Sequence, residues 1–268
     1  MKKKIVVPTD LTEAANQAIR QATVIARKAK VKLVLLHILD DKSQSAIEIE
    51  QNLNLQANNI KKKTGLDCEI ILKEGSVFDA IPNAARENNW DLMVIGTHGI
   101  KGIRQMLIGA DILKLVAKVT IPVLVVQEKV TLVEDFKRII LPVSSHELFL
   151  PAIEALLFFT GLYNTEVHLY SIHKAGFEWP KQLLLNVDET IKLFEAKGIQ
   201  FKRIQEDQNS YSMGYAKQTL KYAASVHADC ICIMSVPSKE YYYFAQSDKE
   251  TLLLNEFNIP VLCVGGGY

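Results

Sequence analysis

The chain has 268 residues, of which 49% are hydrophobic and 23% are charged, and this composition supports a sizeable core in one or two domains. It carries 31 basic and 30 acidic residues, a balance that argues against binding nucleic acid by broad neutralisation of phosphates. There is no apolar run long enough for a membrane span or a signal peptide, so the four cysteines are expected as reduced thiols in a cytoplasmic protein.

Strand-like apolar runs alternate with helical spacing through the first half of the chain. We expect strands at 4–7, 32–39, 68–73, 92–95 and 123–126, and helices at 12–29, 44–63, 77–88 and 111–118. This alternation is typical of parallel βαβ units, whose right-handed crossovers place helices on both faces of one sheet. The unbroken apolar strands fit a sheet that is buried on both sides.

The second half of the chain repeats this plan in the same order. Residues 137–143 match residues 3–9, residues 229–233 match residues 91–95, and residues 259–264 match residues 121–126. Three matched blocks in register are a strong internal-repeat signal. We therefore predict two domains, 1–130 and 135–268, with their boundary in the charged stretch 128–136.

Polar and glycine-rich segments follow the first and fourth strands of the first half. Ligands of open α/β sheets bind beyond the carboxyl ends of the strands, where the strand order reverses. Glycines permit close backbone approach and a helix amino terminus offers free N–H groups, so such a loop can hold phosphate. Lysine and arginine in the loop could neutralise phosphate charge. The candidate residues are Pro8, Thr9, Asp10, Gly96, His98, Gly99, Lys101, Arg104 and Gly109.

At this point the sequence resembles a known family, the universal stress proteins, over both halves and so over nearly the whole chain. The resemblance rests on the start 5–10, the segment 35–38, the segment 91–99, the spacing of Gly96, Gly99 and Gly109, and the closing segment 121–126. It implies an α/β fold of two tandem doubly wound five-stranded parallel sheets of order 3-2-1-4-5, like the adenine-nucleotide alpha-hydrolases. It also implies that the two domains pair through their fifth strands within one chain, and it leaves a homodimer open.

The resemblance further implies an ATP site in the first half, with Asp10 and Ile38 near the base. Ribose and phosphates would then lie on Ile95, Gly96, His98, Gly99 and Gly109. Whether Mg²⁺ binds together with ATP is left open.

One position departs from the family pattern and weakens the ATP interpretation. Ala110 stands where the family has a serine or threonine hydroxyl. The lost hydrogen bond corresponds to about 1–3 kcal/mol, or roughly one to two decades of affinity. Asp111 comes next, and its carboxylate would either repel a triphosphate or simply cap the helix that follows.

The second half departs further from the pattern. Ser144 replaces Asp10, and Met234, Pro237 and Ser247 replace the three glycines. The second loop therefore lacks the N–H-rich backbone of a phosphate cradle, and we expect one nucleotide per chain. The aromatic run 241–244 either fills the vacated cleft or forms a surface for a partner.

We therefore expect a stress-response adenine-nucleotide binding protein that is regulatory rather than catalytic and is read by an unknown protein partner. The alternative is a non-nucleotide interaction protein that uses its second half and keeps a vestigial first site. A slow ATPase is a third hypothesis, but the sequence has no Walker-type lysine motif.

Several polar residues are interpreted as structural rather than functional. His37 is expected as a hydrogen-bonded core residue, and the cysteines Cys230, Cys232 and Cys263 as core thiols rather than metal ligands. The segment 144–146 is expected to cap a helix that begins near Glu147.

Overall fold

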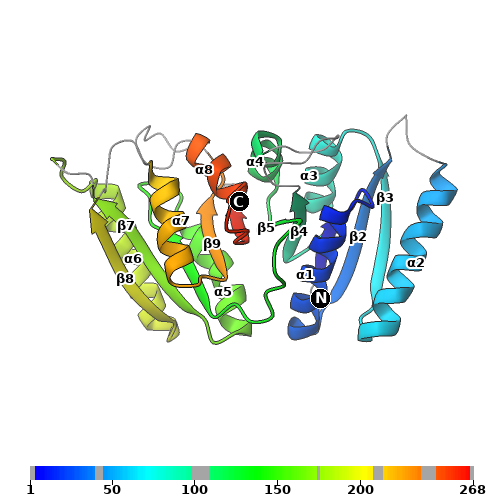
Figure 1. Ribbon diagram of the computed structural model, residues 1–268, viewed down its shortest axis with the longest axis horizontal. Coiled ribbons are helices and arrows are strands. Elements are labelled where there is room, and N and C mark those ends of the chain that lie inside the picture. The colour runs from blue at the N-terminus through cyan, green and yellow to red at the C-terminus, as the bar shows by residue number, and fades with distance from the viewer. Residues whose placement is uncertain are drawn as a thin grey trace.

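The computed structural model describes residues 4–39, 45–97, 109–173, 176–207, 214–236 and 246–265. The strands of the first half are β1 (Lys4–Pro8), β2 (Lys32–Leu39), β3 (Cys68–Glu74), β4 (Leu92–Thr97) and β5 (Val123–Gln127). Those of the second half are β6 (Arg138–Pro142), β7 (Glu166–His173), β8 (Gln200–Asp207), β9 (Cys230–Met234) and β10 (Val261–Val264). These strands form one continuous sheet (Figure 1), in the order β3-β2-β1-β4-β5-β10-β9-β6-β7-β8.

Each half has the predicted strand order 3-2-1-4-5, with parallel pairing throughout. The fold-class prediction is therefore confirmed, and the expected pairing of the two fifth strands within one chain is observed, which joins the two sheets into one. Strand β5 pairs antiparallel with β10, where Val123, Leu124 and Val125 oppose Cys263, Leu262 and Val261. The pairing satisfies backbone groups that would otherwise lie at two exposed sheet edges.

Helices connect the strands of each half and pack against the sheet (Figure 1). They are α1 (Glu13–Ala29), α2 (Ala46–Thr64), α3 (Val77–Glu87), α4 (Gly109–Lys118), α5 (Leu150–Leu162), α6 (Lys181–Lys197), α7 (Tyr215–Ser225) and α8 (Gln246–Leu253). Helix α1 packs on β1, β4 and β5, while α4 and α8 meet at the junction of the two halves. Among the described residues, no helix combines the length and the apolar character needed to cross a membrane.

The linker between β5 and β6 is held by α1. Residues 128–137 form neither helix nor strand, but two buried glutamines of α1 bind their backbone. Gln17 Nε2 donates to the Val130 carbonyl at 2.7 Å. Gln21 both donates to the Val133 carbonyl at 2.8 Å and accepts from its N–H at 2.9 Å. The buried side-chain amides of both glutamines thus find their hydrogen-bond partners in the backbone of the linker. These bonds hold the linker along α1. The domain limits 1–130 and 135–268 stay a prediction.

The predicted cap of α5 is wrong. The helix begins at Leu150, its N-cap is Phe149, and no side chain caps it. Instead, Ser144 Oγ accepts from the N–H of His146 at 3.4 Å, and His146 Nδ1 accepts from the N–H of Leu148 at 3.0 Å. These side chains therefore stabilise the loop ahead of α5 rather than the helix end. The second-half cysteines are fully buried in the core, as expected.

Candidate functional site

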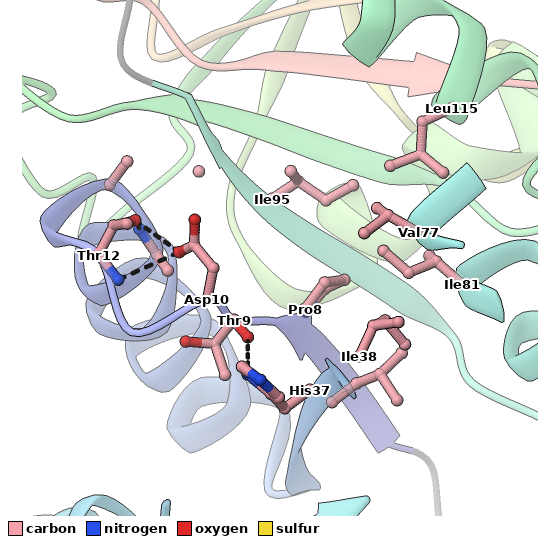
Figure 2. Close-up of a pocket in the computed structure, with 14 residues that line it drawn as sticks. Pro8, Thr9, Asp10, Thr12, His37, Ile38, Val77, Ile81, Ile95 and Leu115 are labelled. Atoms are coloured by element: carbon pink, nitrogen blue, oxygen red, sulfur yellow. Dashed lines mark hydrogen bonds between the residues drawn. The ribbon is translucent and has the colours of Figure 1, made fainter. Parts of the chain in front are cut away.

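A crevice opens at the carboxyl ends of β1, β2 and β4, between α1, α3 and α4 (Figure 2). Its cavity volume is about 70 Å³, which is small for a small-molecule site, so the described residues enclose only part of a ligand. The sequence-predicted residues that line it are Pro8, Thr9, Asp10, Ile38, Ile95 and Gly96. The structure thus brings together three strands that are far apart in the sequence.

The other predicted site residues are placed only in part. Gly109 and Ala110 form the first turn of α4, and the same helix contributes Leu115 to the crevice. The remaining predicted site residues lie outside the described part of the chain: His98, Gly99, Lys101 and Arg104.

The turn from β1 into α1 fixes Asp10 at the mouth of the crevice (Figure 2). Asp10 Oδ1 accepts from both the N–H and the hydroxyl of Thr12, at 3.1 and 2.6 Å. Leu11 adopts a left-handed φ of 66°, which lets the chain reverse between the strand and the helix. Among the described residues, Asp10 Oδ2 has no hydrogen-bond partner. One carboxylate oxygen is therefore held by the protein, and the other can accept from a ligand.

His37 fastens β2 to the end of β1. Its Nδ1 lies 2.7 Å from the Thr9 carbonyl, and because a carbonyl only accepts, Nδ1 is the donor. The side chain is 8% exposed. The interpretation of His37 as a hydrogen-bonded core residue is confirmed, although it also lines the crevice.

The apolar wall of the crevice was missed by the sequence analysis. Val77 and Ile81 of α3 and Leu115 of α4 lie across from Ile38 and Ile95 (Figure 2). Val77 and Ile81 are four residues apart and so share one helix face. That spacing was visible in the sequence, but it did not show that this face leans over the ends of β1 and β4. The crevice is an apolar slot with a polar mouth, and it suits a flat ring with polar edges.

Gly96 allows the end of β4 to pack closely against the first turn of α1, whatever contact it makes to a ligand. A Cβ at this position would lie 2.0 Å from the Ala14 carbonyl oxygen and 2.4 Å from its carbon. Only glycine therefore lets the first turn of α1 approach the end of β4 this closely. The role that the resemblance gives Gly96, a contact to ribose or phosphate, stays a prediction.

The corresponding positions of the second half carry larger side chains. Strands β6 and β7 pair in the register of β1 and β2, so Tyr170 stands where the first half has Leu36. Strand β9 pairs with β6 in the same register as β4 pairs with β1. Met234 therefore stands where the first half has Gly96. Both side chains are buried, Tyr170 at 1% exposure and Met234 at 5%.

Tyr170 is held firmly in this position. Its ring stacks on Tyr222 with centroids 4.6 Å apart, and its hydroxyl donates to Glu206 Oε2 at 2.7 Å. Helix α7 also begins with Tyr215 where α3 begins with Val77. In the second half, aromatic rings thus stand at the positions of Leu36 and Val77, which line the crevice of the first half. The run 241–244 lies outside the described residues, so the two alternatives for it stay open.

Comparison with known proteins links the first half to one family. Residues 1–127 match the Universal stress protein family. A universal stress protein of Methanocaldococcus jannaschii is 26% identical over 157 residues, which cover 48% of this chain and 97% of the relative. One of Bacillus subtilis is 26% identical over 148 residues, which cover 47% of this chain and 100% of the relative. The crystal structure of a universal stress protein from Archaeoglobus fulgidus matches with a TM-score of 0.73 at 18% identity, over 98% of this chain and 96% of that one. It has the same fold across both halves.

Proposed function

Through its first half this chain belongs to the universal stress protein family, and on that premise we propose that it is a stress-response protein that binds an adenine nucleotide. The base would lie in the apolar slot between Ile38, Ile95 and the α3 wall, with Asp10 at its edge. The observation that supports this most is the slot itself, which opens where the strand order reverses. ATP is the ligand that the family resemblance suggests, with or without Mg²⁺.

The proposed contacts to ribose and phosphate lie on the loop after β4 and on the start of α4. Gly109 and Ala110 open α4, whose amino terminus offers N–H groups to an anion. The loop residues His98, Gly99, Lys101 and Arg104 complete the proposed set.

The role that we propose is regulatory. Helix α1 begins at the crevice and holds the linker through Gln17 and Gln21. Helix α4 packs on α8 of the second half. A ligand that stabilises one arrangement of α1 and α4 would shift the balance of conformations between the halves, and a partner protein could read that difference.

Calorimetric titration of the whole chain with ATP tests the function, and we expect one site per chain. Val77→Tyr should weaken binding at least tenfold, because the tyrosine ring would occupy the slot where we propose that the base lies. Helix α7 carries a tyrosine, Tyr215, at the corresponding first position. Ile47→Tyr is the matched control, since Ile47 lies 67% exposed on α2 and its replacement should leave the affinity unchanged. A tyrosine at 77 that leaves binding intact would place the nucleotide elsewhere. Absence of heat with every adenine compound would support the non-nucleotide alternative.

A further inference from the structure

Strand β3 forms one end of the sheet (Figure 1), and its outer edge is open. Among the described residues it pairs only with β2. The Asp67 carbonyl and the Gly75 N–H both bond to β2, and the direction of these groups alternates along a strand. The outward N–H and C=O groups therefore belong to Cys68, Ile70, Leu72 and Glu74. Edge groups of this kind can accept a further strand.

The two ends of the sheet differ in the middle of their edge strands. At the opposite end, β8 carries Lys202 and Arg203 in succession, and charges on an edge strand discourage further pairing. Strand β3 has Ile70, Ile71 and Leu72 in its middle, so it is apolar on both faces there. These three side chains are only partly buried against the core. A further strand beside β3 would cover the apolar surface that they leave.

The sequence of β3 is complementary to itself when two copies run antiparallel. If Ile71 lies opposite the partner's Ile71, then Ile70 lies opposite the partner's Leu72 and Glu69 lies opposite the partner's Lys73. This register agrees with the backbone, because Ile70 and Leu72 then form the hydrogen-bonded pairs through their outward groups. Apolar pairs and opposite charges directly across two strands stabilise a sheet.

Helix α2 stands beside this edge and has the same complementarity. A groove with a cavity volume of about 510 Å³ separates helix and strand, and Glu50 and Lys61 of α2 line it together with Ile70 and Leu72. Counted from the turn that joins α2 to β3, the midpoint between Glu50 and Lys61 lies about 13 Å along the helix, and Ile71 lies about 10 Å along the strand. One twofold axis therefore passes close to both, and it would bring Glu50 of each copy toward the partner's Lys61.

We propose that two copies of this chain associate through β3, antiparallel and with Ile71 at the twofold axis, so that their sheets become continuous. A contact of this kind uses the same surface on both copies and closes on a dimer. The junction of β5 with β10 joins two sheets in the same antiparallel manner inside the chain. The association goes beyond nucleotide binding and does not depend on it.

Sedimentation velocity of the full chain without ligand tests the association. At about 100 µM protein we expect a particle of twice the chain mass of 30.1 kDa. A monomer at that concentration overturns the proposal.

Exchanging the charges on β3 tests the register. Lys73→Glu places a carboxylate opposite the partner's Glu69 at both ends of the contact, and Glu69→Lys places an ammonium group opposite the partner's Lys73. Each variant alone should have a dimer dissociation constant at least about fivefold higher than the wild type. An equimolar mixture should associate within about threefold of the wild type, because opposite charges again face each other at both ends.

The mixture also separates the contact between chains from effects within one chain. Lys73→Glu loses the ion pair with Glu87, and Glu69→Lys loses those with Lys4 and Lys32. Mixing cannot restore these pairs, so recovery in the mixture reports contact between the two copies. A mixture as weakly associated as the separate variants overturns the pairing.

A disulfide across the axis gives a second readout. A non-hydrogen-bonded antiparallel pair separates its Cα atoms by about 4.5 Å, which a disulfide can bridge, so mild oxidation of Ile71→Cys should link two chains. Leu72→Cys is the matched control, because the partner's Leu72 lies two residues further along the strand and out of disulfide range. Failure of Ile71→Cys to link, or an equal yield from Leu72→Cys, would contradict the proposed register.

Discussion

Replacing Gly96 with alanine is expected to lower the free energy of unfolding by about 3 kcal/mol or more. A new Cβ would lie 2.0 Å from the Ala14 carbonyl oxygen, well inside van der Waals contact. Overpacking of a core typically costs about 1–3 kcal/mol when side chains can adjust. Here the obstacle is backbone in the first turn of α1, so relief requires the helix to move away from β4.

Urea unfolding followed by circular dichroism measures this loss. Gly161→Ala is the matched control, because Gly161 lies in α5 with nothing within 4 Å of the added Cβ. That control should stabilise the protein by about 0.5–1 kcal/mol through helix propensity. A loss below about 1 kcal/mol for Gly96→Ala would mean that α1 and β4 do not approach as closely as described. The same movement would open the wall of the crevice, so the variant should also bind adenosine more weakly.

The sequence predicted the fold to within a few residues at most element ends, because the signals that define the elements are local. Apolar runs marked the strands, and the family resemblance added their order. The strand-end residues of the site were also predictable, since parallel strands bring their carboxyl ends to one edge. Pro8, Thr9, Asp10 and Ile95 therefore meet in the crevice.

The features that were missed depend on contacts between distant segments. Val77, Ile81 and Leu115 face the crevice because α3 packs against β2 and α4, and spacing along a helix does not reveal such a contact. The start of α5 was wrong because the polar segment 144–146 resembles a cap, whereas Ser144 and His146 bond within their own loop. Local capping signals cannot distinguish a helix end from a turn that lies ahead of it.

The wild type is expected to gain about 2 kcal/mol of stability relative to Lys249→Met as the pH rises from about 7.5 to about 9.5. Lys249 is 6% exposed, and burial lowers the pKa of its ammonium group to about 8, against a small opposing effect of Cys263. An unfolded lysine keeps its proton to about pH 10.4. Between these values the unfolded chain binds more protons than the folded one, so the free energy of unfolding increases with pH.

Urea unfolding at several pH values, compared between the wild type and Lys249→Met, isolates this contribution. The buried thiols, whose pKa values are raised by burial, act in the opposite direction at high pH, but they are present in both proteins and cancel in the difference. Lys217→Met, at an exposed position of α7, should run parallel to the wild type. Lys249 Nζ donates to the Val236 carbonyl at 2.5 Å. If the stability of Lys249→Met changes with pH as that of the wild type does, Lys249 is not desolvated at this contact.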